Sequence, residues 1–93
     1  MIAVTTPAKE LLRDIELPED TVLRLDPSEQ GRLAFVSGPA QPDDQVVDDG
    51  GQELLHIAGL VSQQLDGHRL DRIDTNQGPQ LTLRAPNDGS PVV

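Results

Sequence analysis

Residues 21–37 decide the fold, and they read TVLRLDPSEQGRLAFVS. Leu23 and Leu25 alternate with polar or smaller residues in the first half, and Leu33 and Phe35 alternate with smaller residues in the second. Apolar side chains at every second position are typical of half-buried β-strands. The intervening DPSEQG contains a proline that fixes φ and a glycine that permits positive φ, which favours a turn. The stretch therefore predicts a β-hairpin.

The residues before this hairpin predict a short edge strand over Met1–Val4, followed by a helix. Thr5 or Thr6 can cap the helix, and Pro18 ends it by about Leu17. The helix should lie on a sheet through one apolar stripe, because four apolar side chains have helical spacing. These are Ala8, Leu11, Leu12 and Ile15.

Turn signals and short strands alternate after the hairpin. Residues 38–44 are rich in proline and glycine and predict a surface loop. A DDGG turn then joins a brief strand at Val46-Val47 to a strand over Gln52–His56. Strand geometry predicts that Leu54 and Leu55 point to opposite faces of the sheet.

The last third of the chain predicts a short helix and a second hairpin. Gly67 follows the helix and suits its end, whereas Gly59 weakens it. Two strands follow over Arg69–Asp74 and Gln80–Arg84, and they are joined by a TNQGP loop. The helix is indicated by the spacing of Ile57, Leu60, Val61 and Leu65.

Together these elements predict an α+β fold, a small mixed or antiparallel sheet curled into a half-barrel or sandwich with two helices on it. Residues 1–86 should form a single domain and residues 87–93 a flexible C-terminal tail, which has proline and glycine but no apolar periodicity. The only aromatic residue is Phe35, so aliphatic side chains must supply the burial. The expected core comprises Leu11, Leu12, Ile15, Leu23, Leu25, Leu33, Phe35, Leu54, Leu65, Leu70, Leu81 and Leu83.

The charge of the chain narrows the choice of partners. The formal net charge is −9, with only seven basic residues. Such a chain repels phosphate backbones and anionic membrane surfaces, so we expect neither a nucleic-acid nor a membrane partner. A protein partner with a basic surface would be attracted. The chain itself should be a monomer or a weak homo-oligomer, since interface aromatics are nearly absent.

Cysteine is absent, so the chain has no disulfide, no thiolate nucleophile and no sulfur ligand. This absence is compatible with both oxidising and reducing compartments. No stretch approaches the roughly 18–20 apolar residues of a membrane span, and the N-terminus lacks the pattern of a secretory signal. Cytoplasm is the default expectation.

Two histidines are the first candidates for a chemical site. His56 and His68 would need a carboxylate nearby, such as Glu53 or Asp66, to bind a metal, and no HExxH-like spacing is present. We expect instead one half-buried strand histidine and one exposed turn histidine.

Acidic and hydroxyl side chains offer the remaining candidates. Asp71 and Asp74 are a conceivable acid–base pair, although sixteen acids make such pairs common. No serine lies in a Gly-x-Ser-x-Gly pattern. We therefore predict no catalytic, cofactor-binding or metal-binding residue. Four further aspartates lack the spacing of an EF-hand loop, and we interpret them as solvated surface charge. They are Asp43, Asp44, Asp48 and Asp49.

The order of elements resembles the HesB-like, A-type iron–sulfur cluster carrier family over about residues 2–87. AVTTPAKELL is similar to that family's opening strand and helix, and VLRLDPSEQGRLAFV to its first long hairpin. PDDQVVDDGGQEL resembles its acidic strand-turn-strand segment, and LDGHRLDRIDTNQGPQLTLRAPN is the nearest match. The resemblance implies a HesB-like domain.

The resemblance also implies where ligands should lie, and this chain departs from it there. The family binds iron or a cluster through a cysteine in the hairpin turn and a Cys-Gly-Cys near the C-terminus. Here the corresponding segments are Pro27–Gly31 and Asn87–Pro91, and neither contains sulfur. Because cluster iron is held mainly by thiolates, the carrier chemistry should be lost and no ligand residue carries over.

Three functions follow in order of preference. The first is a non-catalytic, cysteine-free HesB-like protein that works as a binding or adaptor module, without a cofactor. The second is an acidic regulatory protein for a basic partner. The third is a small metal-dependent enzyme that uses His56 or His68.

Overall fold

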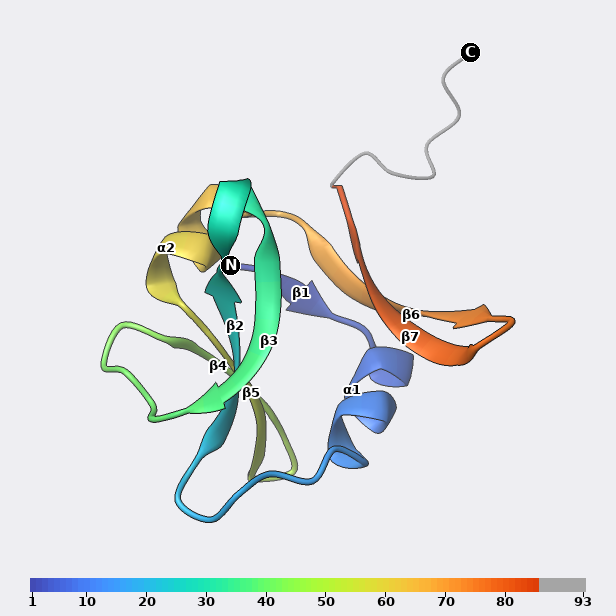
Figure 1. The fold of residues 1–93 in the computed structure, drawn as a ribbon, viewed down its shortest axis with the longest axis horizontal. Helices are drawn as coiled ribbons and strands as arrows, with labels where there is room; N and C mark the ends of the chain where they lie inside the picture. Colours follow the sequence, from blue (N-terminus) through green and yellow to red (C-terminus); the bar gives the residue numbers. More distant parts are fainter. Residues whose placement is uncertain (86–93) are drawn as a thin grey trace.

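The computed structural model describes residues 1–85, so the predicted tail at 87–93 lies outside the described residues. Within them, seven strands and two α-helices form the α+β architecture expected from the sequence (Figure 1). The turn between β2 and β3 contains a short 3₁₀ segment, η1. The elements are β1 (Ala3–Val4), α1 (Thr6–Arg13), β2 (Val22–Pro27), η1 (Glu29–Gly31), β3 (Leu33–Gly38), β4 (Gln45–Asp49), β5 (Gln52–Ile57), α2 (Gly59–Gln64), β6 (Arg69–Thr75) and β7 (Gly78–Arg84).

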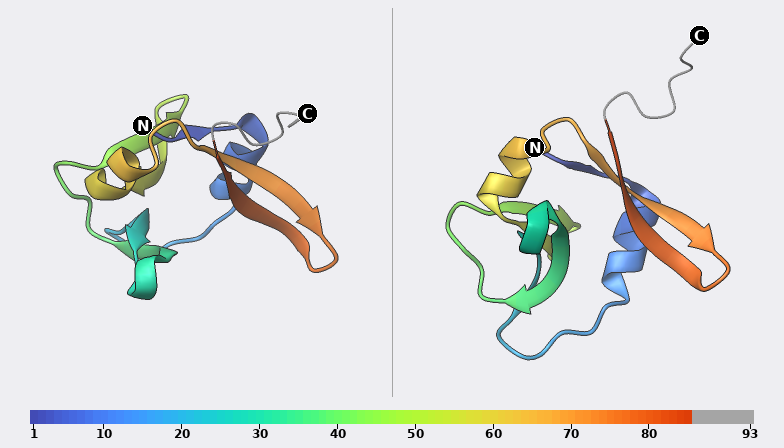
Figure 2. Two further views of the ribbon diagram at one scale, coloured as in Figure 1. Left: turned by 90° about the horizontal axis from the view of Figure 1, so that it is seen from above. Right: turned by 45° about the horizontal axis from the view of Figure 1, so that its top comes forward.

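The strands form two sheets. One has the order β1-β6-β7 and the other the order β3-β2-β5-β4. The sheets are mixed, because β1 pairs with β6 and β2 pairs with β5 in parallel, whereas all three hairpins are antiparallel. Helix α1 contacts β5 of one sheet and both β6 and β7 of the other, and two further views show it between them (Figure 2). The predicted mixed sheet with two helices is confirmed.

Helix α1 begins as predicted but ends earlier. The Thr5 hydroxyl accepts a hydrogen bond from the Ala8 amide at 3.3 Å and so caps the helix. The helix ends at Arg13 rather than near Leu17, because the next two amides bond three residues back and tighten the last turn. Ile15 therefore leaves the apolar stripe and is exposed, contrary to the expected core. No helix within residues 1–85 has the length and apolar character needed to cross a bilayer.

The core lies between the two sheets, and it differs from the predicted one at its edges. Leu33 and Phe35 are exposed because β3 is an edge strand that no other element within residues 1–85 covers. Several predicted core residues are only half-buried, namely Leu11, Leu65, Leu81 and Leu83. The buried cluster comprises Ile2, Leu12, Leu23, Leu25, Val47, Leu54, Leu55, Ile57, Val61 and Leu70.

A register shift corrects the prediction for Leu54 and Leu55. Val47 pairs with Leu55 but the next residue of β4 pairs with Glu53, so Leu54 is an extra residue on β5. A bulge of this kind re-aims the side chains around it. Both leucines consequently join the core, instead of pointing to opposite faces of the sheet.

The side chain of Gln45 ties the N-terminal segment to the four-stranded sheet. Its Oε1 accepts from the Ile2 amide at 2.9 Å, and its Nε2 donates to the Ile2 carbonyl at 2.8 Å. The buried Ser62 hydroxyl donates to the same Oε1 at 2.7 Å. One amide group therefore satisfies polar atoms from two other segments, the N-terminal residues and α2, as the interior requires.

Candidate functional site

The turn between β2 and β3 is where the family resemblance places a cysteine. All five residues of Pro27–Gly31 are exposed, and the last three form η1. Gln30 and Gly31 adopt positive φ values of 58° and 75°. The Ser28 amide donates to the Arg32 carbonyl at 2.7 Å and closes the turn. The turn therefore presents hydroxyl, carboxylate, amide and backbone groups to solvent.

These donors do not fit an iron–sulfur cluster. Cluster iron is held by thiolates, and even Rieske-type centres keep two cysteines. Oxygen donors such as Ser28 and Glu29 suit hard cations instead. The second segment implied by the resemblance, Asn87–Pro91, lies outside the described residues, and its sequence contains no sulfur.

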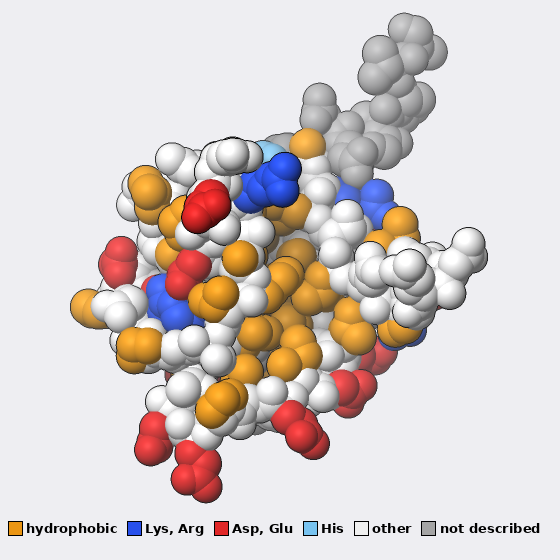
Figure 3. All heavy atoms as spheres, viewed as in Figure 1, with side chains coloured by type: hydrophobic (Ala, Val, Ile, Leu, Met, Phe, Trp, Pro, Cys, Tyr) orange, Lys and Arg blue, Asp and Glu red, His pale blue; other side chains and the backbone are white. Residues whose placement is uncertain are grey.

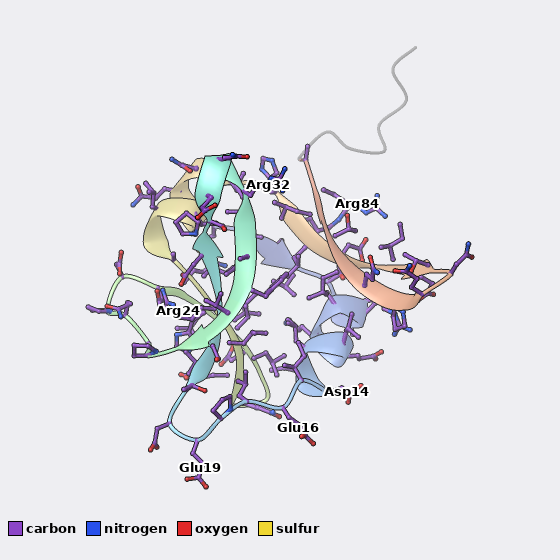
Figure 4. All side chains as sticks on the ribbon, viewed as in Figure 1. Asp14, Glu16, Glu19, Arg24, Arg32 and Arg84 are labelled. Carbon is purple, nitrogen blue, oxygen red and sulfur yellow. The ribbon has the colours of Figure 1, made fainter. Side chains whose placement is uncertain are left out.

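The most extensively bonded polar group lies on β2, where Arg24 points away from the core leucines (Figure 4). Its Nε and Nη2 donate to the carboxylate of Asp26 at 3.2 and 3.0 Å. Its Nη2 and Nη1 also donate to the carboxylate of Asp44, the former at 3.0 Å. The Nη1 group further donates to the Pro39 carbonyl at 3.1 Å. All five N–H groups of the guanidinium therefore have an acceptor.

His56 extends this network across to β5, where it pairs with Arg24 in the parallel register. Its Nδ1 lies 3.3 Å from Oδ2 of Asp44, and its Nε2 lies 3.1 Å from Oε1 of Glu53. A neutral imidazole has one donor, so only the doubly protonated ring donates to both carboxylates. We call the whole network the Arg24 cluster, and it comprises Arg24, Asp26, Asp44, Glu53 and His56.

The centre of the Arg24 cluster, formed by Arg24, Asp44 and His56, is buried because the loop from Pro39 to Asp44 lies over it. The Asp44 side chain is only 1% exposed and that of Arg24 only 7%. The Gln41 amide donates to the Asp44 carboxylate at 2.8 Å, which closes the loop on itself. The cluster thus holds the loop against the sheet through one bidentate arginine–carboxylate pair.

A close approach of two backbones also fixes this loop. A Cβ atom on Gly59 would lie 2.7 Å from Oδ2 and 2.8 Å from the carbonyl oxygen of Asp43. Only glycine fits there without displacement of backbone, so the first residue of α2 packs directly on the loop. The prediction that Gly59 merely weakens the helix missed this role.

The charges of the cluster stabilise one another. Hydrogen bonds from Arg24 hold the pKa of Asp44 below its usual value, burial opposes this shift, and the Gln41 amide and His56 assist it. The same pair raises the pKa of Arg24, with a further contribution from Asp26. Removing one partner of a buried pair typically costs about 3–5 kcal/mol, because the other charge is left uncompensated.

The two histidines do not meet. His56 is bonded to Glu53 as one candidate pairing required, but it is buried rather than half-buried. His68 precedes β6 and is half-buried rather than exposed, and its Nδ1 is buried with no hydrogen-bond partner in the described chain. Asp66 pairs with the N-terminal ammonium group of Met1 instead. Within residues 1–85, no group of three or more histidine or carboxylate side chains is placed to hold a metal ion.

The structure disperses the clustered acids that the sequence suggested. Asp44 belongs to the Arg24 cluster, Asp43 packs on α2, and Asp49 pairs with Arg13. Their carboxylates therefore serve separate contacts, and Asp48 is exposed.

The suggested acid–base pair is likewise separated. Asp71 accepts hydrogen bonds from the hydroxyl of Thr5 at 2.9 Å and from Nε of Arg84 at 3.3 Å. Asp74 accepts instead from Nε of Arg72 at 3.2 Å. Three residues apart on one strand, the two aspartates point to opposite faces, so they do not form a dyad.

Sequence reasoning missed Arg24 as the centre of the polar network. A usable signal was present, because Arg24 and Asp26 are two residues apart on one strand and so share a face. The partners Asp44 and His56 could not be found this way. They reach Arg24 through a parallel pairing of distant strands and a proline-rich loop.

Comparison with solved structures finds similar folds, among them those of IscA and SufA. IscA, from a structure entitled "Crystal Structure of IscA with the [2Fe-2S] cluster", matches 94% of this chain and 84% of its own, with a TM-score of 0.57 and 23% identity. Escherichia coli SufA, described as involved in biosynthesis of iron–sulfur clusters, matches 91% of this chain and 85% of its own, with a TM-score of 0.67 and 21% identity.

Sequence comparison alone finds no such similarity: no family model matches the chain, and no curated protein sequence matches it. The likeness therefore lies in the fold, over nearly the whole described length. The sequence motifs predicted this architecture, and the resemblance of the chain to the HesB-like, A-type iron–sulfur carriers is confirmed in its fold.

Proposed function

We propose that this chain is a non-catalytic binding module that has the fold of the A-type carriers but holds no iron–sulfur cluster. The observation that carries the proposal is the sulfur-free turn at Pro27–Gly31, in a chain that has no cysteine at all. Without thiolates, a cluster has no suitable ligands here. Any connection to cluster assembly would then pass through protein contacts.

The polar groups of the described residues support a binding role rather than a catalytic one. The buried arginine, aspartate and histidine of the Arg24 cluster bond to one another and hold a loop. A catalytic site needs a titratable group with hydrogen-bond reach to a substrate, usually within a concave pocket. No pocket is detected in the described part of the chain. In this proposal residues 1–86 act as one domain, and the cytoplasmic location stays a prediction.

Anaerobic reconstitution with ferrous iron and sulfide tests the proposal. We expect a colourless protein with iron and sulfide far below one per chain, because the turn offers only hard donors. IscA, whose crystal structure contains a [2Fe-2S] cluster, is the positive control under identical conditions. A visible chromophore with equal amounts of iron and sulfide on each chain would overturn the proposal.

A further inference from the structure

Strand β3 has one row of backbone groups that no strand of the described residues pairs with. It is the terminal strand of the order β3-β2-β5-β4. The Ser28 amide donates to the Arg32 carbonyl, and hydrogen-bonded pairs alternate along an antiparallel ladder. The pairs Asp26–Ala34 and Arg24–Val36 are therefore bonded, so the N–H and C=O groups of Leu33 and Phe35 point to the open edge.

The same residues carry exposed apolar side chains. Phe35 is 41% exposed and Leu33 36%. Phe35 lies opposite Leu25 in the register, so its side chain continues the core face of the sheet outward. Figure 3 shows apolar side chains gathered over this face, between β3 and the β6–β7 hairpin.

Of the four strand edges in residues 1–85, β3 is the one without protection. Strand β1 has only two residues, and β7 contains Pro79 and Arg84. Strand β4 contains two aspartates, and its pairing with β5 is interrupted by a bulge. Short length, proline, charge and bulges are the usual ways to prevent edge pairing. Strand β3 reads LAFVSG, with no charge and no proline, and it pairs with β2 in an unbroken register.

The acidic residues at one end of this face favour a basic occupant. Residues 14–20 read DIELPED and cross its lower rim, where Figure 4 shows Asp14, Glu16 and Glu19, while Arg32 and Arg84 lie toward its upper end. A second copy of this chain is the poorer fit, since it would bring another net charge of −9 and the same acidic rim. We infer that the β3 edge binds an extended segment of another protein, in which apolar side chains alternate with lysine or arginine, as an added strand of the sheet.

This inference rests on the proposed binding function and gives it a surface. The probe is a blocked octapeptide of alternating lysine and valine, added to isotope-labelled protein, with hydrogen exchange of single amides as the readout. The outward amides of Leu33 and Phe35 should exchange at least about tenfold more slowly with peptide. The amides of Ala34 and Val36 already bond to β2 and should change little. A glutamate–valine octapeptide should have no effect.

Two variants and one matched control place the effect on the edge. Phe35→Lys removes the apolar contact and adds repulsion, so the protection should be lost. Ser37→Pro removes an outward amide hydrogen and leaves the bonds to β2, so it should also abolish binding while the fold is retained by circular dichroism. Ile73→Lys makes the same charge change at a side chain that is 42% exposed on β6, and it should bind as wild type does.

Each other outcome overturns the inference. If both peptides slow amide exchange equally, or if the lysine–valine peptide does not slow it, the occupant of the edge is not a basic strand. A dimer by sedimentation whose Leu33 and Phe35 amides are protected without peptide assigns the edge to a second copy. If the peptide fails while reconstitution with iron and sulfide leaves the protein colourless, only the edge assignment falls. A reconstituted cluster would overturn the proposed function whatever the exchange shows.

Discussion

The Arg24 cluster and the β3 edge lie on neighbouring strands of one sheet, yet their burial is the reverse of what their side chains favour. Arg24 is almost completely buried, whereas Phe35, the only aromatic residue, is 41% exposed. Charged side chains are rarely buried unless they are paired, whereas large apolar side chains are usually buried. The difference comes from cover: the loop from Pro39 to Asp44 lies over the arginine, and nothing described lies over β3.

The comparison shows that residue type and position in a strand do not by themselves determine whether a side chain near the edge of a small sheet is buried. On the covered side, a complete set of acceptors for Arg24 makes burial of its charge possible. On the open side, the apolar residues keep their strand pairing but lack a second layer.

The largest effect is expected at Asp44. Asp44→Ala leaves the buried Arg24 with Asp26 as its one carboxylate partner and removes the contact that holds the loop, so we expect the free energy of unfolding to fall by about 3 kcal/mol. Asp48→Ala is the matched control, because Asp48 is exposed on β4, and it should change stability by less than about 0.5 kcal/mol. Urea denaturation of both variants gives the measurement. Equal losses would mean that the Arg24 cluster contributes little to the fold.

A smaller effect on the same side is expected from pH. Since the pKa of Asp44 is lower in the folded chain, its contribution is fully present above the unfolded pKa and is lost as pH falls through the folded value. The loss should be smaller than for Asp44→Ala, because the protonated side chain keeps its shape and some hydrogen bonds. Wild type should therefore lose more stability than Asp44→Asn between about pH 5 and pH 2. If the free energy of unfolding depends on pH in the same way in both proteins, the predicted contribution of Asp44 is wrong.

The sequence predicted the order of elements well, because local signals specify them. Alternating leucines, the DPSEQG and DDGG turns and the Thr5 cap all lie where the structure has β2, β3, β4, β5 and α1. Family-like motifs then predicted the fold that the solved structures show.

The sequence could not predict what covers each strand. Phe35 and Leu25 have the same local pattern, but β2 pairs with β5 on its other side, whereas β3 pairs with no second strand among the described residues. The Arg24 cluster needs the parallel contact between β2 and β5, which are separated in sequence by β3, the loop from Pro39 to Asp44 and β4. The bulge at Leu54 likewise depends on pairing with β4 and has no signal in β5 alone.

A substitution of Gly59 tests the backbone contact beneath the loop. Gly59→Ala places a Cβ atom 2.8 Å from the Asp43 carbonyl oxygen, and we expect a loss of about 1–3 kcal/mol from the displacement this requires. Gly38→Ala is the control, because its Cβ would lie 3.5 Å from Cδ of Arg24, an ordinary contact. Thermal unfolding should separate the two. If Gly59→Ala stabilises the chain, helix propensity outweighs the clash and the loop is not packed on α2 as described.

The smallest effect is expected on the open side. Phe35→Ala should lower the free energy of unfolding by less than about 1 kcal/mol, whereas Leu25→Ala, at the paired position on β2, should cost about 2–5 kcal/mol. The reason is that Leu25 is enclosed and Phe35 already meets water. Equilibrium unfolding at two protein concentrations measures both. If Phe35→Ala costs as much as Leu25→Ala, and more so at high concentration, a second copy covers β3 in solution, because only association makes stability depend on concentration.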